Sequence, residues 1–223
     1  AMIDCLIDLG IKWDGMTMTG GDLNSPNSVL DCQNSGTALR LLIAQAATCD
    51  FPITLDGDAS LRARSSLHLV KSLEISAKSL SENSEYPLQL TGPFAAKSVS
   101  IDVSKTSQFH SAMMLMAPRT NGFKINIHGE AVSRKHSDLT WDLCKKTGAV
   151  NQGESWVVNC PDVVIPSDAS MMAFAKLSGL DVENAPEVAD SIGHDLDNTF
   201  LRDSNDLITP MAAWLALGEG GTI

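Results

Sequence analysis

Hydrophobic and polar positions along the chain form a pattern that recurs nearly three times. In each copy a short apolar, strand-like run ends in a small polar cluster, and a helix-like apolar run follows at once. Each predicted helix start carries Ser, Thr, Asn or Asp, the residues that cap helices. The copies are NSVLDCQNSGTALRLLIAQAA (27–47), KSVSIDVSKTSQFHSAMMLMA (97–117) and VVIPSDASMMAFAKL (163–177), with caps at Asn34-Ser35, Thr106-Ser107 and Ser167-Asp168.

The repeated unit is longer than this segment. Each copy is preceded by a helix that runs into a strand, a turn, a second strand and a Gly or Pro. The helix-to-strand stretches are 5–13, 69–80 and 143–152, and the second strands are 16–19, 86–90 and 156–158. The unit therefore reads helix–strand–strand–strand–helix–strand over about 65–70 residues. A fourth copy begins with a strand and cap at 201–208 and a helix at 210–217.

Helix starts of this kind predict a site for an anion. The first backbone N–H groups of a helix have no partner within it, and the helix dipole favours negative charge there. Several such starts in one repeated fold suggest that they gather around one anionic ligand. The alternative is a plain α/β solenoid whose helices only bury apolar residues such as Met113 and Met116.

Composition limits the possible classes of protein. The chain has 223 residues, of which 43% are hydrophobic and 19% charged, as in a globular protein. A net charge of -11 argues against general nucleic-acid binding and against an anionic membrane surface, but a few local arginines can still hold a small anion. Five cysteines without a CxxC pair favour reduced, buried thiols in a cytosolic protein. Both ends read as interrupted elements, so we expect a piece of a longer protein.

Two motifs combine glycine and arginine after a strand. In NSGTALR (34–40), Gly36 stands in a first helical turn, where it costs about 1 kcal/mol relative to Ala. A close ligand approach to the backbone would justify it; a tight helix–strand contact is the alternative. In DGDASLRAR (56–64), Arg64 is suited to bidentate capture of carboxylate or phosphate, whereas Arg62 is interpreted as a surface residue.

Two further motifs offer hydroxyl, amide and carboxylate groups. Thr106, Ser107 and Gln108 present two hydroxyls and an amide at one helix start, which suits a phosphate or polyol but also an ordinary cap. In the segment 203–210, Asp206 or Asp203 is a candidate general base, with helix capping as the alternative.

Taken in order, these motifs resemble the enolpyruvyl transferases, and most closely the branch whose acceptor is shikimate 3-phosphate. The resemblance runs from about residue 2 to residue 223. The matching segments are NSGTALR (34–40), GDASLRARS (57–65), TSQFHSAMM (106–114), VSRKH (132–136) and NDLITPMAAW (205–214).

The resemblance implies an α/β fold of repeated βαβαββ units, the inverse α/β barrel or prism of these transferases, with three units in each of two domains. Residues 1–165 would be the shikimate-3-phosphate-binding domain, incomplete at its N-terminus. Residues 166–223 would be the first part of the second domain. The family's opening Lys-Ser motif and its later Lys-Glu-Ser/Thr-Asp-Arg motif have no counterpart here, so we expect this chain alone to lack full activity.

The resemblance also implies roles for single residues. Thr106, Ser107, Gln108 and Ser133 would hold shikimate 3-phosphate. Gly36, Arg64 and Gln108 would meet phosphoenolpyruvate, and Asp206 would lie beside the acceptor hydroxyl as the catalytic base. This chain departs from the family pattern at three positions, with Ser65 and Asn205 in place of Pro and His136 in place of Tyr.

The implied activity is transfer of the enolpyruvyl group from phosphoenolpyruvate to the 5-hydroxyl of shikimate 3-phosphate, on the pathway to chorismate and the aromatic amino acids. It needs no metal and no organic cofactor. The family implies a cytoplasmic and, at full length, monomeric enzyme with these two small substrates and neither a nucleic acid nor a membrane as partner. Two alternatives stay open: the UDP-N-acetylglucosamine enolpyruvyl transferase, whose loop Cys has no counterpart in 57–64, and a non-catalytic anion-binding fragment.

Overall fold

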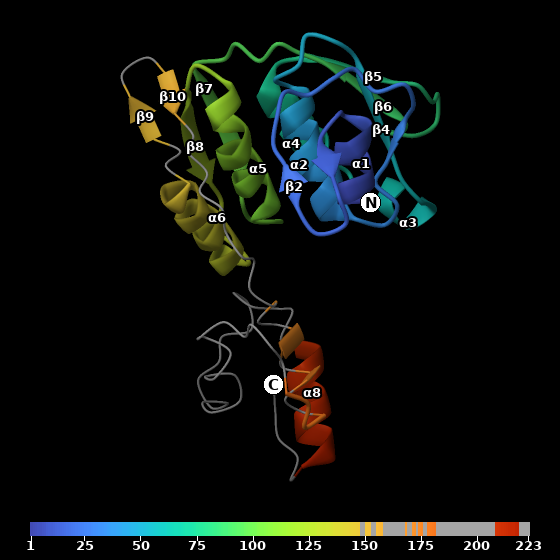
Figure 1. Cartoon of the computed structure of the whole chain (residues 1–223), viewed down its shortest axis with the longest axis vertical. Coiled ribbons are helices and arrows are strands. Elements are labelled where there is room, and N and C mark those ends of the chain that lie inside the picture. Colours follow the sequence, from blue (N-terminus) through green and yellow to red (C-terminus); the bar gives the residue numbers. More distant parts are fainter. Residues whose placement is uncertain are drawn as a thin grey trace. The chain divides into compact units, whose positions relative to one another are not determined.

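The computed structural model (Figure 1) describes residues 1–147, the backbone of 150–152 and 155–157, residues 168, 171–172, 174–175 and 178–181, and residues 208–218. The chain divides into two compact units. The first comprises Ala1–Ala131 with His136–Cys160, and the second comprises Val132–Lys135 with Pro161–Ile223. The domain boundary expected at residue 165 stays a prediction.

The first unit contains the predicted repeat. Its first copy runs α1 (Met2–Asp8), β1 (Lys12–Trp13), β2 (Met18–Thr19), β3 (Leu30–Asp31), α2 (Gly36–Ala46) and β4 (Ile53–Asp56). After a short helix α3 (Ala59–Arg62), the second copy runs α4 (Leu67–Leu73), β5 (Ser76–Ser79), β6 (Leu88–Thr91), β7 (Ser98–Asp102), α5 (Gln108–Met116), the 3₁₀ turn η1 (Ala117–Arg119) and β8 (Lys124–His128). A third copy starts with α6 (Arg134–Lys146), β9 (Val150–Gln152) and β10 (Ser155–Val157). The predicted order of elements is found in the described residues, with the unpredicted helix α3 added between the first two copies.

Two predicted strands begin two residues later than expected; the strand expected over 86–90 begins at Leu88 as β6. The sequence suggested a strand over 16–19, but β2 begins only at Met18. The side chain of Asp14 accepts hydrogen bonds from the backbone N–H groups of Met16 at 2.9 Å and Thr17 at 2.7 Å. This local turn occupies residues that would otherwise extend the strand.

The second unit contributes two described helical stretches. Asp168 accepts a hydrogen bond from the backbone N–H of Met171 at 3.0 Å, which confirms the helix cap predicted at Ser167-Asp168. The helix predicted over 210–217 is also found, as α8 (Ile208–Leu217). The strand predicted over 201–208 lies outside the described residues except for its last position.

Strand pairing couples the first two copies. β3 pairs with β4 in parallel, β4 pairs with β6 antiparallel, and β6 pairs with β5 antiparallel, giving the order β3-β4-β6-β5. β7 and β8 form a second parallel pair. Each parallel pair is joined by one helix, α2 or α5, as a parallel connection requires. The pairs β1–β2 and β9–β10 are antiparallel.

The core is built on α2 and α5, which pack against each other between the sheets (Figure 1). Gln45 near the end of α2 donates through Nε2 to the carbonyl of Leu115 near the end of α5, at 3.1 Å. Gln108 at the start of α5 donates to Thr37 at the start of α2, at 2.9 Å. The two helices therefore run in the same direction, and their N-termini lie together. In the described part of the chain, no helix combines the length and apolar character needed to cross a membrane.

Candidate functional site

The paired starts of α2 and α5 form the base of the site. Ser35 has an extended backbone, and its Oγ accepts from the N–H of Ala38 at 3.1 Å, which confirms the predicted cap of α2. At α5 the Oγ1 of Thr106 accepts from the N–H of Gln108 at 3.1 Å. Ser107 is buried but makes no side-chain cap hydrogen bond. Both helices thus direct their positive ends to the same region.

Gln108 links the two helices at this end. Its Oε1 accepts a hydrogen bond from Arg40 Nη1, and its Nε2 donates to Thr37 Oγ1. The guanidinium of Arg40 also lies over the ring of Phe109, with 5.8 Å between the carbon Cζ and the ring centroid. This combination of contacts holds Arg40, a long side chain with many rotamers, in one orientation.

A second arginine reaches the same place from the loop after α3. Arg64 Nη2 donates to Asn34 Oδ1 at 2.6 Å and to Ser60 Oγ at 3.0 Å. Gly36 lies close to both cations: a Cβ built on it would stand 2.9 Å from Arg40 Nη1 and 3.6 Å from Arg64 Nη1. A methyl group here would crowd the end of the Arg40 side chain, whereas its distance to Arg64 is an ordinary van der Waals contact.

The charges of the site are not balanced within it. Burial lowers the pKa of Arg40; Tyr86 opposes this by raising that pKa, and the neighbouring charge of Arg64 lowers it by a smaller amount. Among the residues that the structure describes, no carboxylate forms an ion pair with Arg40 or Arg64. Two guanidinium groups beside two helix N-termini favour a bound anion, because its charge would relieve their mutual repulsion.

Arg62 has a different environment. It is exposed, and its guanidinium forms an ion pair with Asp56 in which Nε donates to Oδ1 at 2.8 Å and Nη2 donates to Oδ2 at 2.5 Å. Its charge is thereby matched by a carboxylate, and its interpretation as a surface residue is confirmed.

The structure brings five of the predicted residues together. Gly36, Arg64, Thr106, Ser107 and Gln108 all lie at or beside the two helix starts. Ser133 belongs to the second unit, where its backbone has a positive φ of 51°. Asp203, Asn205 and Asp206 lie outside the described residues. Among the described residues, no group of three or more His, Cys, Asp or Glu side chains is arranged to hold a metal ion.

Arg40 and Thr37 were not singled out from the sequence, and Asn34 was named only as part of a helix cap, although all three stand in the motif NSGTALR. Arg40 follows Gly36 by four positions on α2, so the two share a helix face. That spacing could have drawn attention to Arg40. The contact between Arg40 and Gln108, 68 residues apart, depends on how α2 and α5 pack.

The repeated α/β unit, with helix starts and arginines around one glycine, defines this chain as a protein with the enolpyruvyl transferase fold. Residues 1–177 match the family model of EPSP synthase (3-phosphoshikimate 1-carboxyvinyltransferase). The chain belongs to this family.

Similar proteins agree with this assignment. The chain is 37% identical over 148 residues to the 3-phosphoshikimate 1-carboxyvinyltransferase of Methanothrix thermoacetophila, covering 64% of this chain and 35% of that protein. It is 29% identical over 230 aligned positions to the protein of the same name from Methanothermobacter thermautotrophicus, covering 96% of this chain and 52% of the relative. The chain thus spans about half or less of the length of these relatives.

A solved structure gives the fold independently. An EPSP synthase from Acinetobacter baumannii superposes with a TM-score of 0.62 at 23% identity, covering 78% of this chain and 43% of that one. The α/β fold expected from the sequence is confirmed.

Proposed function

We propose that this chain is the acceptor-binding part of an enzyme that transfers the enolpyruvyl group of phosphoenolpyruvate to the 5-hydroxyl of shikimate 3-phosphate. The observation that carries the proposal is the site itself: two parallel helix starts, with Arg40 and Arg64 both beside Gly36 and with Gln108 between the helices. The reaction brings two anionic substrates together, and this arrangement suits anions. Membership of the family and the names of the relatives support the same reaction.

The two ends of the site suit different substrates. We assign the 3-phosphate of the acceptor to the start of α5, where Thr106, Ser107 and Gln108 offer hydroxyl, amide and backbone donors, with Ser133 as a further ligand. Phosphoenolpyruvate is assigned to Gly36 and Arg64, with Gln108 between the two substrates. We add Arg40 to the residues assigned to phosphoenolpyruvate, because its guanidinium and the guanidinium of Arg64 both lie close to Gly36.

The chemistry then proceeds by addition and elimination. The 5-hydroxyl oxygen bonds to C2 of phosphoenolpyruvate while C3 gains a proton, giving a tetrahedral ketal phosphate. Loss of inorganic phosphate from C2 and of a proton from C3 restores the double bond. Asp206 is the proposed base that takes the proton of the hydroxyl. The arginines and helix starts stabilise the phosphate and carboxylate charges throughout, and no step requires a metal or an organic cofactor.

Neither alternative from the sequence is preferred. The family match and the named relatives do not favour UDP-N-acetylglucosamine as the acceptor. A non-catalytic anion-binding role stays the alternative for this polypeptide by itself, because the chain spans about half or less of the length of these relatives. For the whole enzyme we propose a cytoplasmic, monomeric protein whose partners are its two small substrates.

Calorimetric titration of the chain with shikimate 3-phosphate tests the proposal. UDP-N-acetylglucosamine serves as the control ligand, and the double variant Ser107→Ala/Gln108→Ala as the control protein. We expect saturable heat with shikimate 3-phosphate alone and its loss in the double variant. Binding of UDP-N-acetylglucosamine instead would contradict the acceptor assignment, and equal binding by the variant would contradict the site.

A further inference from the structure

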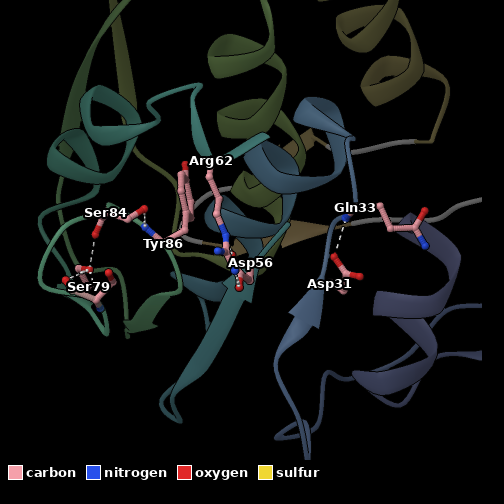
Figure 2. A network of polar contacts seen from close by, with 8 residues as sticks. Asp31, Gln33, Asp56, Arg62, Ser79, Ser84 and Tyr86 are labelled. Carbon is pink, nitrogen blue, oxygen red and sulfur yellow. Dashed lines mark hydrogen bonds and ion pairs between the residues drawn. The ribbon is translucent and has the colours of Figure 1, made fainter. Parts of the chain in front are cut away.

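An ion pair beside the candidate site connects the elements that carry Arg64. Figure 2 shows Arg62 and Asp56 directed toward each other, with both oxygens of the carboxylate bound by the guanidinium. Exposed ion pairs with a single contact contribute little, but a bidentate pair fixes the relative orientation of its two groups. The side chain of Asp56 is only 16% exposed, so this end of the pair is held within the protein.

The pair spans the short helix α3. Asp56 is the last residue of β4, and Arg62 is the last residue of α3. Between them the side chain of Asp58 caps the helix by accepting from the N–H of Leu61 at 2.8 Å. A helix of four residues is not stable by its own hydrogen bonds. The ion pair and the cap therefore hold this turn against the end of the strand.

The same turn determines the position of Arg64. The backbone N–H of Arg64 donates to the carbonyl of Leu61 at 2.9 Å, and its side chain donates to Ser60, which lies within α3. Any tilt or unwinding of α3 moves both anchors of Arg64 together.

The strand end that carries Asp56 is also tied to the second partner of Arg64. The carbonyl of Asp56 accepts from the N–H of Cys32 at 2.8 Å, and the N–H of Asp58 donates to the carbonyl of Gln33 at 2.9 Å. These bonds hold the loop that continues to Asn34, the other side-chain acceptor for Arg64. Asp56 thus lies where both supports of Arg64 meet.

We propose that the Asp56–Arg62 ion pair is a positioning device that orients Arg64 for phosphoenolpyruvate. In this proposal neither residue is assigned a contact with the ligand; the pair acts through α3 on the guanidinium of Arg64. For its ligand this inference rests on the proposed function. Because the acceptor phosphate is assigned to the start of α5, breaking the pair should weaken the binding of phosphoenolpyruvate and leave that of shikimate 3-phosphate unchanged.

The test uses Asp56→Asn, Arg62→Gln and the exchanged pair Asp56→Arg/Arg62→Asp. Phosphoenolpyruvate is titrated at saturating shikimate 3-phosphate, shikimate 3-phosphate is titrated alone, and amide hydrogen exchange is followed at Arg64. Asp142→Asn, which breaks the exposed Lys145–Asp142 pair of 2.7 Å on α6, is the matched control. We expect each single variant to raise the Kd of phosphoenolpyruvate about threefold to tenfold and to speed exchange at Arg64. The exchanged pair should restore both the Kd of phosphoenolpyruvate and the exchange rate at Arg64. The control variant should change neither quantity.

Two results would overturn the positioning role. One is unchanged phosphoenolpyruvate binding with unchanged exchange at Arg64 in both single variants. The other is an equal loss of both ligands, which indicates general destabilisation. If the unsubstituted chain binds neither ligand, the proposed function fails, and exchange at the Arg64 amide still decides whether the ion pair holds this segment.

Discussion

At the scale of single residues, Gly36 is unfavourable for helix stability but leaves room for a side chain of the candidate site. It occupies the first turn of α2, where alanine would be the better helix former. A methyl group there would meet the far end of the Arg40 side chain, which can move, rather than rigid backbone. Glycine at this position is therefore explained by the placement of Arg40 and not by the stability of the helix.

We expect Gly36→Ala to leave the free energy of unfolding within about 1 kcal/mol of the original value. The same change should displace Arg40 from Gln108 and weaken phosphoenolpyruvate binding about tenfold or more. Chemical denaturation measures the first quantity and calorimetry at saturating shikimate 3-phosphate the second. Phosphoenolpyruvate binding that survives intact would show that Arg40 is not needed in its observed orientation.

At the scale of elements, the start of α2 serves both the stability of the helix and the candidate anion site. Ser35 caps the helix there, and the positive end of the helix dipole lies at the same place. Ser35 satisfies one backbone N–H of the helix through its hydroxyl. Asp would satisfy that N–H equally well and would favour the helix dipole, but it would place a negative charge beside the anion site.

The two substitutions at Ser35 should therefore have opposite effects. Ser35→Ala is expected to lower the free energy of unfolding by about 1 kcal/mol, with affinity for phosphoenolpyruvate retained. Ser35→Asp should keep the stability and reduce that affinity about tenfold. Urea denaturation and calorimetry on the same preparations test both, and an aspartate variant with unreduced affinity would place the bound anion elsewhere.

At the scale of the whole molecule, burial controls the chemistry of the cysteines. The four cysteines within the described residues, Cys5, Cys32, Cys49 and Cys144, are at most 7% exposed. Burial raises the pKa of Cys49 and of Cys144, which lowers the fraction of reactive thiolate.

We expect a thiol reagent such as Ellman's reagent to modify these four cysteines slowly in the native protein and rapidly in denaturant. Peptide mass spectrometry identifies which residues react and so separates them from Cys160. Fast modification of Cys32 or Cys49 under native conditions would mean that the packing around α1, α2 and β3 opens readily.

The sequence by itself determined the order of helices and strands, the caps at Ser35 and Asp168 and the motifs that indicate the family. These follow from local periodicity and from residues close together in the chain. The tertiary structure alone decided that α2 and α5 run parallel, that Arg40 meets Gln108, and that Arg62 pairs with Asp56 while Arg64 does not. These contacts depend on which strands pair and on how the helices between them pack. The spacing of residues along the sequence does not specify packing between distant segments.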